Sequence, residues 1–220
     1  MRSLTITGFL TLLIAILMTL VSGSDVQPVD QKSDFQTAIV ALELAQSTAE
    51  VLSAIGGDPG SPLRQGLKRG TWLDFAFLLS YSTLNALILL YLYGRRALSV
   101  GALYAGVLLS VLMAAGDIFE NVQLLRILDF GVTDLETYSL SSLIFWTHLK
   151  WFALFAASAL IGVGYARLGG RLYFFYGFCY CSTAMMGLLG LAFSGPLVEL
   201  SALFLGLCWL ISTIAHFRLT

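Results

Sequence analysis

Four ionisable residues lie within or at the edge of strongly apolar stretches of this chain, where a charge is costly. Asp74 begins one such stretch, and Asp117 and Glu120 end a second one. Lys150 interrupts a third. A charged side chain near the centre of a membrane-spanning helix costs roughly 2.5–3.5 kcal/mol on insertion scales, so such groups pair with one another or line a wet cavity. We therefore predict that the four side chains converge on one polar site.

Further polar residues recur at helical spacing beside these charges. Asp117, Glu120 and Asn121 are three and four positions apart, so a helix presents all three to one neighbour. Tyr81 and Asn85 follow the first aspartate at seven and eleven positions, again on one helical face. The predicted polar cluster therefore comprises Asp74, Tyr81, Asn85, Asp117, Glu120, Asn121, His148 and Lys150, with Glu43 as a further contributor.

This cluster admits a structural and a functional interpretation. In the first, Lys150 pairs with Asp117 or Glu120 and only orders the helices; in the second, the cluster binds a ligand, a lipid headgroup or a proton. A metal site that used these carboxylates with His148 would lack the Glu-x-x-His and His-Glu-x-x-His spacings. The chain also contains no Gly-x-Ser-x-Gly motif, phosphate-binding loop or dinucleotide-binding fingerprint. The sequence thus assigns no catalytic residue, metal or cofactor, and it favours binding over catalysis.

Composition places the chain among membrane proteins. Hydrophobic residues make up 58% of its 220 residues and charged residues only 11%, against about 25% charged residues in ordinary soluble domains. The net charge of −1 offers no basic surface, which excludes nucleic acid as a partner. Apolar runs of about 20 residues predict transmembrane helices. We expect six such spans, at 4–21, 72–93, 98–115 with a helical extension to 128, 140–165, 172–193 and 197–215.

Charges in the short loops predict the orientation of these spans. Arg95 and Arg96 follow the second span, Arg167 and Arg171 the fourth, and Arg218 the sixth, whereas the loop between the third and fourth spans is acidic. Arginine-rich loops face the cytoplasm. The prediction is a multi-pass protein of the plasma or inner membrane, with both termini cytoplasmic if the first span is retained. At about 1.5 Å per residue, the polar cluster then lies toward the outer leaflet.

The chain before the second span divides into two parts. Residues 1–23 are a signal peptide or a first transmembrane anchor, because a short basic start, an apolar core and small residues near Gly23 suit both. Residues 24–70 form an extracytoplasmic segment with an amphipathic helix at 34–55, begun by a capping box at Ser33 and Gln36 and ended by Gly56. We expect its apolar face to pack on the outer ends of the second and third spans. Residues 71–220 hold the remaining five helices.

A set of short motifs occurs in this order along the chain: Glu43-Leu44-Ala45, Leu73-Asp74-Phe75 with Tyr81, Asp117-x-x-Glu120-Asn121, and Lys150-Trp151. This set resembles an uncharacterised family of small bacterial multi-pass membrane proteins. The resemblance covers residues 35–164 and implies a location in the bacterial plasma membrane. No activity is established for that family, so the resemblance implies no function.

The expected fold is an all-α, polytopic helical membrane bundle of five or six transmembrane helices with one extracytoplasmic amphipathic helix. Its expected function is to bind a small amphiphile, a lipid or a partner helix at the polar cluster, with the lipid bilayer around it. One alternative is an ion- or proton-coupled transporter or channel subunit, since intramembrane carboxylates with a lysine are typical of such paths. The other is a lipid-modifying enzyme that uses Asp117 or Glu120 as a general base.

Overall fold

The computed structural model describes residues 2–22, 28–30, 34–193 and 195–218, and these residues form helices and no strand. Six of the helices described are long and apolar enough to cross a membrane. Each corresponds to one of the six predicted spans, so the all-helical class and the six long apolar helices are confirmed. The six helices are α1 (Arg2–Ser22), α4 (Pro62–Gly94), α5 (Val100–Asp129), α7 (Ser141–Arg167), α8 (Arg171–Phe193) and α9 (Gly195–Arg218).

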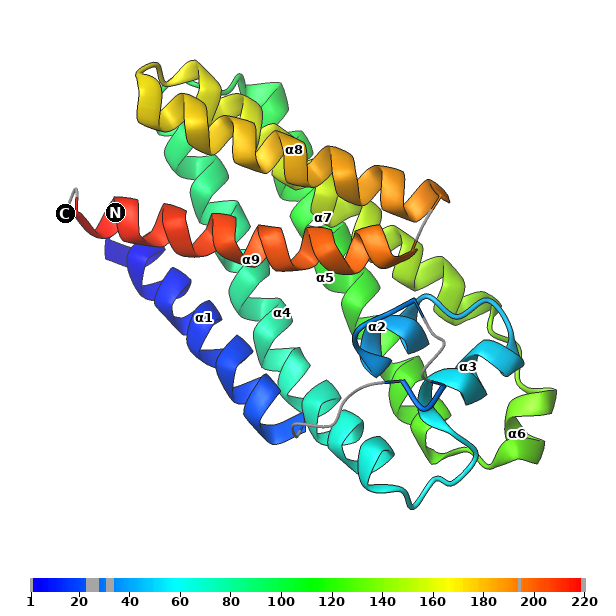
Figure 1. Cartoon of the computed structure of the whole chain (residues 1–220). Helices are drawn as coiled ribbons and strands as arrows, with labels where there is room; N and C mark the ends of the chain where they lie inside the picture. The colour runs from blue at the N-terminus through cyan, green and yellow to red at the C-terminus, as the bar shows by residue number, and fades with distance from the viewer. Residues whose placement is uncertain (1, 23–27, 31–33, 194, 219–220) are drawn as a thin grey trace.

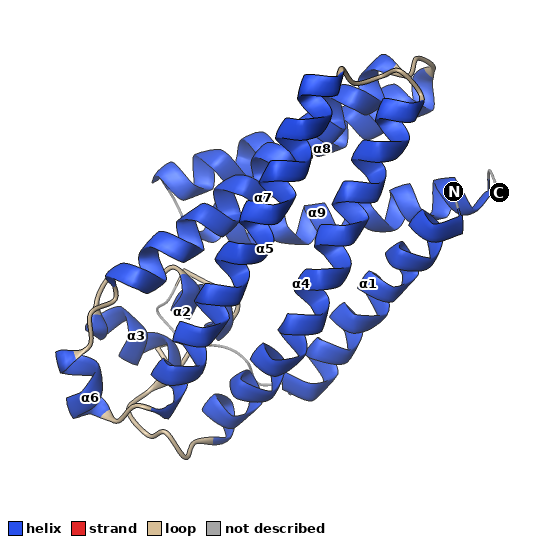
Figure 2. Ribbon diagram, turned by 180° about the vertical axis from the view of Figure 1, so that it is seen from behind, coloured by secondary structure: helices blue, strands red, loops and turns tan. Residues whose placement is uncertain are grey.

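The six long helices pack as a closed ring. Consecutive spans are neighbours, and α9 returns to contact α1, while α4 also touches α7 across the ring. The start of α1 and the end of α9 lie side by side at one end of the bundle (Figure 1). Three short helices gather at the opposite end, as both views show (Figure 2). That end is called the outer end here, after the predicted orientation.

The outer segment was predicted to form one helix, but it forms two. Where a helix at 34–55 was expected, the structure has α2 (Ala38–Glu43) and α3 (Thr48–Ile55). Ser47 accepts a hydrogen bond from the Glu50 backbone, and the Glu50 carboxylate accepts one from the Gln46 backbone. This local pair of bonds starts a new helix at Thr48 instead of continuing the first one. Ser33 of the expected capping box lies outside the described residues.

The ends of the neighbouring helices follow from short local signals. Gly56 ends α3 as predicted, with a φ of 72° that side-chain-bearing residues rarely adopt. Helix α4 begins at Pro62, ten residues before the predicted 72, because Ser61 caps it and proline suits a first helical position. Residues 62–70, which the sequence assigned to the outer segment, therefore extend the second span outward.

The short helices close the outer end of the bundle. Helices α2 and α3 bury their apolar faces against α4, α5 and α7, and against α6 (Val132–Thr137). The docking predicted on the second and third spans is therefore confirmed, and it extends to the fourth. This outer core is separate from the larger core between the spans. Its fully buried members are Ala38, Leu42, Val51, Ile127, Leu128 and Leu143.

A buried arginine joins two helix ends within this outer core. Arg64 donates from Nε to the Ile55 carbonyl at 3.3 Å, from Nη1 to the Phe130 carbonyl at 2.6 Å, and from Nη2 to the Gly56 carbonyl. These carbonyls belong to the C-terminal ends of α3 and α5, which lack helical donors and carry partial negative charge. The position of Arg64 is thus explained by packing, although the loop-charge rule disfavours a positive charge at the end of the bundle that is predicted to face outward.

Close helix approach depends on glycine at two contacts. A Cβ at Gly162 of α7 would lie 2.9 Å from the Gly177 carbonyl oxygen of α8. A Cβ at Gly66 of α4 would meet the Ser22 carbonyl oxygen at the end of α1. Small residues at such crossings let membrane helices pack backbone to backbone. The contact between α4 and α1 makes the first helix an integral part of the bundle.

Candidate functional site

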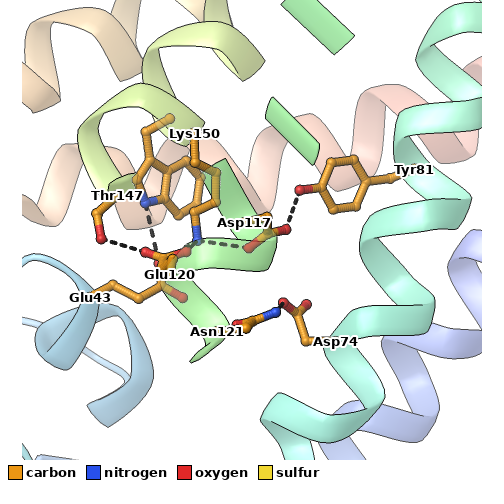
Figure 3. Close-up of polar contacts among 9 residues, drawn as sticks. Glu43, Asp74, Tyr81, Asp117, Glu120, Asn121, Thr147 and Lys150 are labelled. Atoms are coloured by element: carbon orange, nitrogen blue, oxygen red, sulfur yellow. Dashed lines mark hydrogen bonds and ion pairs between the residues drawn. The ribbon is translucent and has the colours of Figure 1, made fainter. Parts of the chain in front are cut away.

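Lys150 lies at the centre of a buried group of acidic side chains (Figure 3). Its Nζ is 3.0 Å from Glu43 Oε2 and 3.4 Å from Asp117 Oδ1, and it also contacts Glu120 Oε2. The lysine side chain is only 7% exposed. The predicted pairing of Lys150 with the third span is therefore confirmed, and Glu43 joins it from α2. These four residues are called the charged cluster below.

Neutral donors hold the carboxylates of the charged cluster. Thr147 Oγ1 donates to Glu120 Oε1 at 2.6 Å, and Trp151 Nε1 donates to Glu43 Oε2 at 3.2 Å. Tyr81 donates its hydroxyl proton to Asp117 Oδ2. Thr147 lies three positions before Lys150 and so shares its face of α7. Trp151 follows Lys150 directly and reaches Glu43 through its indole nitrogen. Every carboxylate of the cluster thus has both a cationic and a neutral partner, which reduces the cost of burying it.

Asp74 lies next to the charged cluster but outside its ion pairs. Asn121 Nδ2 donates to Asp74 Oδ2 at 2.7 Å, so α5 holds this carboxylate through an amide (Figure 3). Asn121 follows Glu120 directly, and the two side chains point to different neighbours, α4 and α7. One helix therefore positions both halves of the site.

Asn85 and His148 were predicted to belong to the site, but their hydrogen-bond partners lie outside the charged cluster. Asn85 Oδ1 accepts from Trp209 Nε1 at 3.1 Å, and its amide nitrogen faces Met113 Sδ at 3.9 Å. His148 Nδ1 lies 2.7 Å from the Ile144 carbonyl oxygen of its own helix. Asn85 therefore links α4 to α9 beneath the site, and the contacts of His148 are local to α7. Within the described residues no group of three His, Cys, Asp or Glu side chains is arranged to hold a metal.

Glu43 is the member of the charged cluster that lies outside the spans, at the end of α2. Burial raises the pKa of Glu43 above its ordinary value, and the nearby Lys150 charge partly opposes this change. The physical cause is the loss of hydration of the ionised carboxylate. Glu43 therefore takes up a proton at a higher pH than an exposed glutamate does.

Two cavities meet at this site. The smaller one, of about 260 Å³, lies between α1, α2 and α4 at the outer end. The larger one, of about 310 Å³, lies between α1, α4, α7 and α9. Glu43 and Asp74 border both cavities, while Asp117 and Lys150 border the larger one. The larger cavity matches the lower end of the size range of small-molecule sites.

Helix α9 contributes two site residues that were not predicted from the sequence, Trp209 and Glu199. Trp209 borders the larger cavity and stacks on Tyr81, with ring centroids 5.5 Å apart. Glu199 accepts hydrogen bonds from the Gln36 backbone at 2.8 Å and from Thr37 Oγ1 at 2.6 Å, which ties the outer segment to α9. Glu199 is the only acidic residue between 195 and 218, and that isolation was the available sequence signal.

Comparison of the chain with protein-family models, with curated proteins and with solved structures gives no match. The resemblance to small bacterial multi-pass proteins is carried by the ordered motifs alone, and it stays a prediction. What the site can do therefore follows from its own geometry: buried charges at one place, with apolar space leading away from them.

Proposed function

We propose that this chain is an integral protein of the plasma membrane that binds a small amphiphile at the charged cluster. The observation that carries the proposal is the larger cavity, which has Lys150 and Asp117 at its polar side and Leu203 of α9 at its rim. Leu203 is 65% exposed, as expected for a side chain that faces lipid. Polar groups at one end and apolar walls at the other suit a headgroup and a hydrocarbon chain.

Helix α1 supplies one wall of both cavities, which supports a retained anchor over a cleaved signal peptide. Thr11 and Ala15 border the larger cavity, and Met18 and Ser22 border the smaller one. Removal of α1 would open both cavities to lipid along one side. The residues around Gly23, where a cleavage site was considered, lie outside the described part of the chain.

The same proposal places both termini in the cytoplasm, following the arginine-rich loops. Leu168→Cys, in a protein without its native cysteines, tests this orientation in the loop between α7 and α8. We expect an impermeant thiol reagent to label this cysteine only after cell lysis. Labelling in intact cells would reverse the orientation.

Binding is favoured over transport because buried charged side chains do not continue through the described part of the bundle. Beyond Asn85, the buried residues of α4 are apolar, with Ile88 and Leu92 fully buried, and Ile161 of α7 is buried beside them. Proton or ion paths need polar groups along their whole length. Among the described residues in this part of the bundle no Asp, Glu, Lys or Arg is buried, and the buried polar side chains are hydroxyl-bearing ones such as Ser158, Tyr180 and Ser212.

Binding is also favoured over lipid-modifying catalysis. Glu120 is 0% exposed, holds Lys150 and Thr147, and borders neither of the two cavities. A general base needs to reach the proton that it abstracts. Asp117 does border the larger cavity, but Tyr81 donates a hydrogen bond to its Oδ2, and Lys150 lies 3.4 Å from its Oδ1 and forms an ion pair that favours the ionised carboxylate.

Photolabelling tests the proposed amphiphile site. The protein is reconstituted in lipid vesicles with a dodecyl amphiphile that carries a diazirine near the end of its chain, and labelled peptides are mapped by mass spectrometry. We expect labels on the segments of α1 and α9 that border the larger cavity. Labels confined to the lipid-facing surfaces of the other spans would contradict the proposal.

A cavity-filling variant makes this test specific. Gly206 borders the larger cavity, and a Cβ built on it meets no atom within 4 Å, so Gly206→Leu should occupy the space without a clash. We expect it to reduce labelling of α1 and α9 several-fold. Gly101 likewise has open space around its Cβ position but borders neither cavity, which makes Gly101→Leu the matched control. Equal labelling in both variants would refute a site in this cavity.

A further inference from the structure

Negative charge exceeds positive charge around the two cavities. Glu43 and Asp74 border both of them, and Asp117 borders the larger one, with Glu120 directly behind. Of the described residues that border either cavity, Lys150 alone carries a positive charge. When all these groups are ionised, four carboxylates face one ammonium, so three negative charges lack a positive counterpart.

Lys150 already forms ion pairs with the three carboxylates of the charged cluster. Its Nζ contacts Glu43, Asp117 and Glu120, and these three contacts account for every ion pair that it makes among the described residues. Asp74 takes part in none of the ion pairs found in the described part of the chain, and its contact there is the neutral amide of Asn121. A carboxylate at the junction of both cavities is thus left for a positively charged group to approach.

Aromatic rings line the larger cavity together with this carboxylate. Phe77, Tyr81, Trp151 and Trp209 all border the larger cavity. Tyr81 packs between Phe77, at 5.0 Å between ring centroids, and Trp209. Aromatic faces attract cations, and grouped aromatic rings recognise ammonium ligands. Lys150 Nζ already lies 4.9 Å from the centroid of the Trp151 ring, so this wall accommodates a cation in the folded protein.

We propose that the ligand of this site is a single-chain amphiphile with a cationic amine or ammonium headgroup, bound at Asp74 and the aromatic rings that line the larger cavity with it. This inference rests on the proposed amphiphile-binding function and names its ligand class. The larger cavity, of about 310 Å³, holds roughly ten water-sized groups, which suits one short chain. An anionic headgroup would add to the excess of negative charge.

Competition with the photoreactive probe tests the headgroup. Four competitors share one chain length: dodecylamine, dodecyltrimethylammonium, dodecanol and dodecanoate, each at neutral pH, where the primary amine is protonated. Labelling of α1 and α9 in the reconstituted protein is the readout. We expect both cationic competitors to halve the labelling at concentrations at least about tenfold lower than dodecanol or dodecanoate requires.

Variants locate the headgroup within the site. Asp74→Asn should remove most of the advantage of dodecylamine over dodecanol while it leaves dodecanol competition unchanged. Glu136→Gln, which removes an exposed carboxylate of α6 at the same end of the bundle, is the matched control and should change neither. Phe77→Leu keeps the wall apolar but removes one ring, and should weaken dodecyltrimethylammonium more than dodecanol. This second variant tests the inference even if Asp74→Asn fails to fold.

Lysophosphatidylethanolamine, with a phosphate beside its ammonium, distinguishes two sources of the headgroup. Competition by dodecylamine alone assigns a free amine, and competition by both assigns an ammonium that is recognised beside a phosphate. Competition by the lysophospholipid alone would overturn the inference.

The remaining outcomes separate the inference from the function on which it rests. If dodecanol or dodecanoate competes as well as dodecylamine does, the site binds amphiphiles but does not select a cation, and the inference is wrong. If no competitor reduces labelling and Gly206→Leu has no effect, the amphiphile site itself is wrong.

Discussion

Replacement of Lys150 by methionine is the perturbation with the clearest expected energy. The side chain is 7% exposed and contacts three carboxylates, so Lys150→Met leaves Glu43, Asp117 and Glu120 around an apolar group. Removing one partner of a buried ion pair typically costs about 3–5 kcal/mol. At roughly 2–4 °C per kcal/mol for a chain of this size, the unfolding midpoint should fall by about 10 °C.

A second substitution should restore part of this loss, and the structure predicts which one is better. Glu120 is 0% exposed and keeps only Thr147 once the lysine is gone, so Lys150→Met with Glu120→Gln should recover the larger part. Asp117 retains the Tyr81 hydroxyl, so Lys150→Met with Asp117→Asn should recover less. Glu43 retains Trp151 and lies outside the spans, where a proton or water can compensate its charge.

Thermal unfolding in detergent, followed with a thiol-reactive fluorophore, measures these differences. Cys208 is buried and Cys179 and Cys181 are half-buried, so the dye reacts as the bundle opens. Lys68→Met is the control, because its partner Asp129 is 69% exposed and surface ion pairs contribute about 0–1 kcal/mol. The ion-pair explanation is refuted if neither double variant is more stable than Lys150→Met alone. Recovery of stability without recovery of photolabelling would instead assign the charged cluster a role in binding.

Three further predictions concern other parts of the fold. Burial raises the pKa of Glu43 above 4.5, so the contribution of Glu43 to stability is full below pH 4.5 and falls as the pH rises through the raised pKa. The unfolding midpoint of the original protein should therefore decline across this pH range, and the midpoint of Glu43→Gln should lack that decline. Arg64→Met should cost about 2–4 kcal/mol in the same unfolding assay, since three carbonyls lose a charged donor, whereas Arg69→Met, at an exposed position, should cost nothing measurable. Gly162→Ala should cost about 1–3 kcal/mol because its Cβ meets the backbone of α8, and the control Gly101→Ala should be neutral or slightly stabilising. Equal unfolding midpoints for these two variants would contradict the close approach of α7 and α8.

Local patterns determined the helices and much of the charged cluster. The length of an apolar run decides whether a helix spans a membrane, and that property is readable along the chain at every one of the six spans. The pairing of Lys150 with α5 was predictable for a similar reason, because a charge at that depth needs a partner and the preceding span carries carboxylates at a matching level. Helical spacing placed Thr147 on the face of Lys150, but the prediction that Asp117, Glu120 and Asn121 all face one neighbour is wrong, because Glu120 contacts α7 and Asn121 contacts α4.

Tertiary structure decided which side chains from distant elements complete the site. Glu43 enters the charged cluster from α2, and Trp209 reaches Asn85 from α9, across 107 and 124 positions of sequence. Spans that are apolar on all sides carry little periodic signal for which face meets which neighbour, so neither the ring order nor the cavity between α1 and α9 was readable. The carbonyl cradle of Arg64 likewise depends on where the outer segment docks, whereas the break between α2 and α3 follows from the local capping bonds of Ser47 and Glu50. Sequence therefore determined that charges on different helices must meet, whereas packing alone created the apolar space beside them.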